Sequence, residues 1–262
     1  MSELTYASYL EVEKLLELQT PRSEPAEHDE QLFIIIHQVY ELWFKLLLHE
    51  FEKVRADFLS GELYGAMHTW KRCRTVMKTL VGQLDILETM TPLSFASFRD
   101  RLEHASGFQS SQFRELEFLL GYKRSEMLRY HPQGSPAYER LTARLRELSV
   151  YDAFYDLLEA HGLDIPNELR DRDVELPNVA DDKVQDGLVE IYNSRPDLAL
   201  LLEQMTDFDE GFQEWRYRHV KMVERTIGNK TGTGGSLGVA FLRESLFRPV
   251  FPDLWAIRAR LG

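Results

Sequence analysis

Cysteine is nearly absent from this sequence. Its 262 residues include a single cysteine, Cys73, so no internal disulfide can form. That composition is typical of a reducing compartment. The Cys-x-x-Cys-His pattern of covalently attached haem is missing as well. A chain of this length buries enough apolar surface to fold without disulfide or zinc staples, so we expect packing alone to hold it.

Positive charge and uninterrupted apolar runs are also scarce. Lysine and arginine total 31 against 43 aspartate and glutamate, a net charge of −12. A surface this acidic repels phosphate backbones, so no nucleic-acid partner is expected. The longest strongly apolar stretch, residues 32–48, is interrupted by polar side chains such as His37 and Lys45, and is predicted to be too polar to span a membrane. With no signal-peptide pattern at the start, the sequence predicts a soluble, cytoplasmic protein.

Helical periodicity dominates what is present. Apolar residues recur every three or four positions over residues 33–58, 70–87 and 208–222. Each run marks one face of a helix. Thr91-Pro92 is typical of a helix start, with an N-cap followed by proline. No strand alternation is evident, so the sequence predicts an all-α fold. We expect one domain over residues 1–262, with a small helical excursion near residues 122–165.

The eight histidines do not follow the common non-haem metal patterns. None has Asp or Glu three residues before it, and no two are four residues apart. Both di-iron and zinc helix motifs are therefore disfavoured. His37 and His219 lie in the register of apolar stripes. They are either core imidazoles bonded to backbone carbonyls, or a haem ligand and a polar group on the opposite haem face, because haem iron commonly takes one proximal imidazole.

Two further features could bind a small charged ligand. The glycine-rich run 230–238 begins with lysine after a predicted helix, which is not the order of a phosphate-binding loop. It is either a flexible connection or a loop whose Thr233 and Ser236 hydroxyls close over a zwitterion. Arg99 follows Phe95 by one helical turn. It is either a solvated surface arginine or a clamp for a carboxylate, which a guanidinium binds through two parallel hydrogen bonds.

Several segments together resemble the tryptophan 2,3-dioxygenase family. They occur in the family's order, from the first residues to about residue 241, and that order makes the resemblance specific. The segments are Leu4–Leu10, Phe33–Leu46, Leu87–Pro92, Phe95–Arg99, Ser106–Arg114, Trp215–His219 and Gly232–Ser236.

The resemblance implies an all-α fold of the tryptophan/indoleamine dioxygenase type and a haem b (iron protoporphyrin IX) enzyme. Such an enzyme opens the indole ring of L-tryptophan with O2 between C2 and C3 to give N-formyl-L-kynurenine, the first step of the kynurenine route. Three alternatives stay open: a relative that uses a modified tryptophan or inserts one oxygen atom, a haem sensor or carrier without turnover, and a helical scaffold without a cofactor.

Matched positions carry the family's roles on the cofactor side of the site. By resemblance, His219 is the proximal ligand of the haem iron. Gly232 and Gly234 belong to the loop that binds the cofactor. His37 is the distal histidine, which faces the indole N–H of the substrate as a hydrogen-bond partner and is not an indispensable base.

The substrate side is assigned in the same way. Arg99 matches the arginine that holds the substrate carboxylate, and Thr233 the threonine near the ammonium group. Phe33 and Phe95 match aromatic walls of the pocket. A pocket of this kind would satisfy each part of tryptophan.

The N-terminal match implies an oligomer. Tyr6 and Tyr9 match tyrosines that reach the active site of a neighbouring subunit in the family's homotetramer. The chain also departs from its relatives at two positions, since Leu84 stands where an aromatic residue is common and His104 where proline is common. Both departures leave room for a changed substrate.

Overall fold

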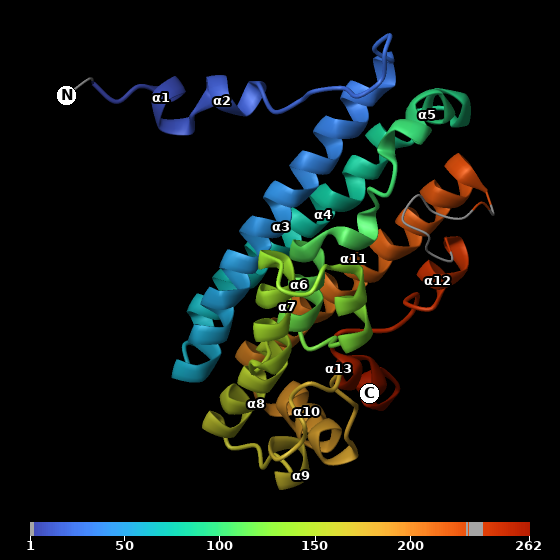
Figure 1. Ribbon diagram of the computed structural model, residues 1–262. Coiled ribbons are helices and arrows are strands. Elements are labelled where there is room, and N and C mark those ends of the chain that lie inside the picture. The colour runs from blue at the N-terminus through green and yellow to red at the C-terminus, as the bar shows by residue number, and fades with distance from the viewer. Residues whose placement is uncertain (1–2, 229, 231–237) are drawn as a thin grey trace.

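The structure is a computed structural model that describes residues 3–228, 230 and 238–262 (Figure 1). No strand occurs among these residues, so the predicted all-α fold is confirmed. The α-helices are α1 (Tyr6–Leu10), α2 (Val12–Leu16), α3 (His28–Ser60), α4 (Leu63–Leu87), α5 (Pro92–Arg99), α6 (Ser111–Leu119), α7 (Pro136–Arg146), α8 (Val150–Ala160), α9 (Asn167–Arg170), α10 (Asp182–Ser194), α11 (Pro196–Ile227), α12 (Val239–Arg243) and α13 (Pro252–Ala256). Short 3-10 turns are η1 (Asp100–Leu102), η2 (Gly107–Gln109), η3 (Ser125–Tyr130) and η4 (Ile257–Arg260).

Local sequence explains where the helices begin and end. The predicted start at Thr91-Pro92 is confirmed, because the Thr91 side chain accepts a hydrogen bond from the Ser94 backbone and Pro92 is the first residue of α5. α3 ends at Gly61, whose φ of 74° is left-handed and whose N–H bonds to the carbonyls of Asp57 and Phe58. Glycine adopts that conformation without steric cost, so the chain can turn directly into α4.

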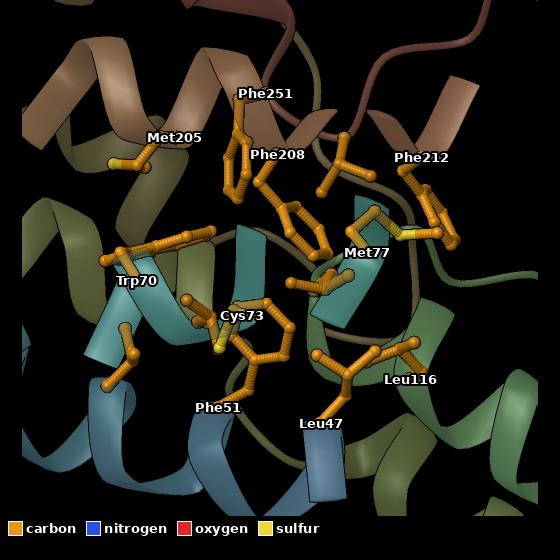
Figure 2. Close-up of a cluster of buried hydrophobic side chains, with 14 of the residues drawn as sticks. Leu47, Phe51, Trp70, Cys73, Met77, Leu116, Met205, Phe208, Phe212 and Phe251 are labelled. Atoms are coloured by element: carbon orange, nitrogen blue, oxygen red, sulfur yellow. The ribbon is translucent and has the colours of Figure 1, made fainter. Parts of the chain in front are cut away.

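The three longest helices, α3, α4 and α11, pack together and carry the main core (Figure 1). Their apolar stripes face one another, as the periodicity predicts. Trp70 lies at the centre, with ring centroids 5.1 Å from Phe51, 5.5 Å from Phe208 and 5.6 Å from Phe251. Figure 2 shows these rings converging from different segments with Met77 and the other buried side chains. Edge-to-face aromatic packing of this kind gives the bundle a rigid base.

Residues 122–165 do not all pack in the same place. α8 lies on α3 and its buried face joins the main core. η3 and α7 instead cover a smaller cluster that is formed by Phe108, Phe118, Met127, Leu141 and Leu145. The division of the chain into one domain with an excursion stays a prediction.

Helix α3 is long and apolar enough, by length and composition, to cross a bilayer. Its best window has a mean hydropathy of 1.3, and 22% of that window is buried. The expectation that residues 32–48 are too polar for a span was therefore wrong. It is the one helix in the described part of the chain that passes, and core helices pass the same test. The packing of α3 against α4, α6 and α8 favours the core role.

The N-terminal segment lies apart from the bundle. Figure 1 shows α1 and α2 extending from the top of α3 away from the other helices. Among residues 3–18 no side chain is buried, and the exposed ones include Leu4, Leu10, Leu15 and Leu16. The described residues of the bundle therefore leave these apolar side chains exposed.

Candidate active site

A pocket with a volume of about 530 Å³ opens between α3, α5, α6, α11 and α12. Its size is in the range of small-molecule and cofactor sites, roughly 300–1,000 Å³. The lining includes Phe33, His37, Phe95, Arg99 and His219. Tertiary packing thus brings together five predicted site residues that span almost 190 positions of the sequence.

His37 lies one turn after Phe33 on α3 and opens onto the pocket. Its Nδ1 lies 2.6 Å from the carbonyl oxygen of Phe33. Because a carbonyl only accepts, Nδ1 carries the proton of the neutral ring, and Nε2 is left as an acceptor. Desolvation lowers the pKa of His37, against the smaller opposing effects of the Phe33 hydrogen bond and the Glu41 charge. The imidazole is therefore neutral at pH 7 and can accept an N–H.

His219 lies on α11 and lines the same pocket. Its ring stacks on Trp215 at a centroid distance of 5.1 Å and an angle of 8°. Burial lowers the pKa of His219 to about 4, and the charges of His37 and Arg114 add to the effect. No hydrogen-bond partner for either ring nitrogen occurs among the described residues. The ring is thus held in place by stacking and keeps a free lone pair.

The donor set suits a metal that brings most of its own ligands. Within residues 3–228, 230 and 238–262, no group of three or more His, Cys, Asp or Glu side chains could hold a metal ion. A porphyrin supplies the equatorial ligands itself and needs a single imidazole from the protein. His219 offers one, and the surrounding wall is apolar, with Phe44, Leu84 and Leu87 in the lining. These residues fit a haem group.

An aromatic wall and an arginine adjoin His37. The ring centroids of Phe33 and Phe95 are 5.8 Å apart, and Phe98 completes the group at 5.6 Å from Phe33 and 5.5 Å from Phe95. Arg99 is the last residue of α5 and lines the pocket beside this wall. A flat apolar ring that carries a carboxylate would find complementary groups here.

Sequence reasoning missed the role of Glu41, which lies one turn after His37. Its carboxylate accepts hydrogen bonds from Ser110 Oγ at 2.6 Å and Gln112 Nε2 at 2.8 Å. Ser110 in turn caps α6 through the Phe113 backbone N–H. Glu41 therefore anchors the start of α6, and with it the pocket-lining residues 106–110, to the helix that carries His37. Its spacing from His37 was the available signal.

A second missed feature is a charged part of the wall. Glu117 on α6 is surrounded by the guanidinium groups of Arg114, Arg124 and Arg216, and all four residues line the pocket. Burial opposes ionisation of this carboxyl, but the three arginines outweigh it and lower the pKa of Glu117 to about 2. Arg216 precedes His219 by three residues, which places both on one face of α11.

Of the remaining predicted site residues, the structure describes only Tyr6 and Tyr9. Tyr6 and Tyr9 are 78% and 70% exposed on the N-terminal segment and are not part of the lining. Thr233, Gly232 and Gly234 lie outside the described residues, although Gly238 after them lines the pocket. Of the two departures, Leu84 is buried in the lining, whereas the exposed His104 is not among the lining residues.

Comparison with known proteins agrees with this geometry. The family model described as tryptophan 2,3-dioxygenase matches residues 1–148 and 187–261. A protein named tryptophan 2,3-dioxygenase from Herpetosiphon aurantiacus is 54% identical over 258 residues, which cover 98% of each chain. Proteins of the same name from Anaeromyxobacter dehalogenans and Saccharopolyspora erythraea are 50% and 44% identical, over 98% and 99% of this chain and 96% and 93% of their own lengths.

Proposed function

The chain belongs to the tryptophan 2,3-dioxygenase family, and we propose from this that it cleaves the indole C2–C3 bond of L-tryptophan with O2. The product is N-formyl-L-kynurenine, and the reaction opens the kynurenine route of tryptophan degradation. The observation that carries this conclusion is the single pocket shared by the two histidines, the aromatic wall and Arg99, in a chain 54% identical to a named dioxygenase.

We propose that the cofactor is haem b and that His219 holds its iron. The support is a neutral imidazole that lines the pocket without a hydrogen-bond partner in the described part of the chain. When bound, the haem supplies the oxygen chemistry. Gly232 and Gly234 keep their predicted place in the loop that binds the cofactor.

The residues of this chain bind and orient the amino acid. Arg99 pairs with the substrate carboxylate through its planar fork. Phe33 and Phe95 pack against the indole, and the unprotonated Nε2 of His37 accepts the indole N–H. Thr233 is proposed to contact the ammonium group. Holding the indole carbons at the reacting position is mainly a problem of positioning, which raises the effective concentration of the reactants. His37 therefore acts as a hydrogen-bond acceptor that orients the ring.

We further propose that the protein is a cytoplasmic homotetramer with no membrane or nucleic-acid partner. The single cysteine supports this location, and the net charge of −12 disfavours binding to nucleic acid. The exposed apolar residues of α1 and α2 support an intermolecular role for the N-terminal segment, since contiguous exposed apolar surface usually marks an interface. Tyr6 and Tyr9 would then complete a neighbour's pocket.

Labelled oxygen tests the reaction. Ferrous, haem-loaded protein is incubated with L-tryptophan and isotopically labelled O2, and the product is weighed by mass spectrometry. We expect a ring-opened product that contains two labelled atoms. One labelled atom in an intact ring would instead favour a relative that inserts a single oxygen atom. Turnover of a modified tryptophan alone would favour a relative with a changed substrate. Haem binding without loss of tryptophan would favour a haem sensor or carrier. A protein that never develops a haem absorbance band would be the scaffold.

A mixing experiment tests the intersubunit role. One subunit lacks residues 1–18 and keeps its own pocket, and the other carries His219→Ala and keeps its N-terminal segment. If Tyr6 and Tyr9 act in a neighbour, co-assembled subunits recover activity that neither parent has. If mixed tetramers form but remain inactive, the N-terminal segment does not act in the pocket of a neighbouring subunit.

A further inference from the structure

We propose that Arg114, Arg124 and Arg216, gathered around Glu117, bind a propionate carboxylate of the haem. We call these four residues the arginine wall. This inference rests on the proposed haem function, and it assigns to the cofactor a charged contact in addition to His219.

The first observation is an excess of buried positive charge. Arg124 bonds both oxygens of Glu117, at 3.1 Å and 2.8 Å, and Arg216 bonds one of them at 3.0 Å. Arg114 pairs with the same carboxylate. Glu117 and Arg216 are 1% and 4% exposed, so three guanidinium charges share one carboxylate at a net charge of +2. Burying unbalanced charge is costly, and an added anion would relieve that cost.

Two neighbouring carboxylates act on the arginine wall without pairing with it. Glu126, whose charge acts on Arg124, is exposed and forms no ion pair with the wall in the described structure. Asp209 is the next acidic group whose charge acts on Arg216. Its oxygens accept hydrogen bonds from the backbone N–H groups of Val250 and Phe251 and from Trp255 Nε1. It is therefore bonded to another segment and forms no ion pair with the arginine wall in the described structure.

The second observation is a surplus of hydrogen-bond donors. A guanidinium has five N–H groups and no acceptor. The acceptors in the wall are Glu117 and the Arg248 carbonyl, which Arg216 Nη1 reaches at 2.9 Å. Within the described residues, Arg114 Nη2 and Arg124 Nη1 make no hydrogen bond. Both arginines bond the same oxygen of Glu117, so a further carboxylate with two oxygens could take one hydrogen bond from each.

The third observation is that the wall is held in a fixed shape. The Arg216 guanidinium lies over the rings of Phe212 and Tyr122, at 4.4 Å and 4.8 Å from their centroids. Arg124 lies over the same Tyr122 ring at 4.8 Å. Stacking limits the rotamers of these long side chains, so little entropy is lost when they bind an anion.

The fourth observation selects the ligand. The arginine wall and His219 line one pocket, and Arg216 and His219 share a face of α11. Haem b carries two propionate carboxylates, whereas the other expected carboxylate, that of tryptophan, already has Arg99 beside the aromatic wall on α5. The cofactor is therefore the carboxylate source that the arrangement favours.

The test compares haem with its dimethyl ester, in which both propionate charges are masked. Each is titrated into the full-length apo-protein, and the dissociation constant is read from absorbance. Wild type should bind haem more tightly than the ester. Arg124→Gln should weaken haem binding by roughly 10- to 100-fold, because a charge-assisted hydrogen bond is lost, and leave ester binding nearly unchanged. Equal losses for haem and ester, or no loss for either, would overturn the proposal.

Two further variants separate binding from folding. Arg140→Gln is the matched control, since Arg140 is an arginine paired with Glu115 on the surface beside α6, 54% exposed and outside the pocket lining. It should change neither affinity. Glu117→Gln removes the negative charge and should keep or increase the preference for haem over the ester. A purely structural wall predicts the reverse, a parallel loss of both affinities.

The outcomes also separate this inference from the proposed function. Wild type that binds neither compound would refute the haem enzyme and the arginine wall together. Wild type that binds haem and consumes tryptophan, while Arg124→Gln keeps the full preference for haem over the ester, would refute the arginine wall alone.

Discussion

Asp209 and Glu117 are both buried carboxylates, but the groups around them balance their charges in different ways. Asp209 follows the core residue Phe208 on α11, and N–H donors from Val250, Phe251 and Trp255 match its oxygens. Glu117 lies in the pocket wall, where three guanidinium groups offer more donors than it can accept. The core completes its buried charges internally, as folded proteins normally do. In the pocket, guanidinium charges are left unbalanced and ring nitrogens lack hydrogen-bond partners among the described residues. This pattern indicates that a ligand binds there.

The two histidines extend this comparison. Their pKa values are lowered by burial, so both are neutral at pH 7. Neutral donors can also lack partners in the core, as Trp70 Nε1 does. An unpaired polar atom alone therefore does not distinguish the pocket from the core. The pocket differs because it holds unbalanced charges and imidazole lone pairs without a partner in the described part of the chain. This difference predicts that core substitutions lower stability without changing ligand binding, and that pocket substitutions do the opposite.

The largest effect is expected in the core. Phe208→Ala removes a ring whose centroid lies 5.0 Å from that of Phe51 and 5.5 Å from that of Trp70. Loss of contact and a residual cavity should lower the free energy of unfolding by about 3–5 kcal/mol. Thermal denaturation measures this, and the folded fraction should keep the wild-type KM for tryptophan. A changed KM with a small fall in Tm would break the division between core and pocket.

Next in size is His219→Ala. Removal of the only proposed protein ligand should abolish stable haem binding or change the coordination of the haem. Activity should fall by more than about 100-fold, because mutating a residue that only hydrogen-bonds a metal ligand already costs roughly 10- to 100-fold. The absorbance spectrum and tryptophan consumption measure both. Because the imidazole has no hydrogen-bond partner in the described residues, the Tm of the apo-protein should stay nearly constant. An intact haem spectrum would remove His219 from the site.

Arg99→Ala should have an intermediate effect on substrate binding. The lost charge-assisted hydrogen bonds should raise the KM for tryptophan by roughly 10- to 100-fold. Steady-state kinetics at saturating O2 measure it. Arg101→Ala is the control, since Arg101 lies two positions away, is exposed and does not line the pocket. Equal effects of the two substitutions would mean that Arg99 contributes only surface charge.

The smallest expected effect is a pH dependence of apo-protein stability. His219 has a pKa of about 4 when folded and an ordinary value of 6.5. Between these values the unfolded chain binds the extra proton, so stability falls as the pH drops from about 6.5 toward 4. Compared with His219→Ala, wild type should lose about 1–3 kcal/mol more over this range. Chemical denaturation at pH 7 and pH 4.5 measures the difference. Parallel pH profiles would contradict a desolvated imidazole.

Much of the fold follows from local pattern. The stripe from Ile36 to Phe58 becomes the buried face of α3, and the Thr91-Pro92 start is observed. The candidate residues of the site came from the family resemblance, and the pocket brings five of them together. The supporting groups did not come from the sequence. Glu41 bonds a residue 69 positions away, and Glu117 bonds Arg216 across 99 positions. Pairs so distant in the sequence cannot be predicted from the periodicity of apolar residues.

By itself, the sequence determined the helical fold and the buried faces of α3, α4 and α11, because hydrophobic period and capping residues act within a few turns of the chain. The order of the matching segments identified the family. Only the tertiary structure decided which polar groups lie together. It placed His37 and His219 in one cavity, surrounded Glu117 with three arginines and left Tyr6 and Tyr9 outside. The physical reason is that the balance of a buried charge is set by neighbours in space, and those neighbours come from segments that meet only when the helices pack.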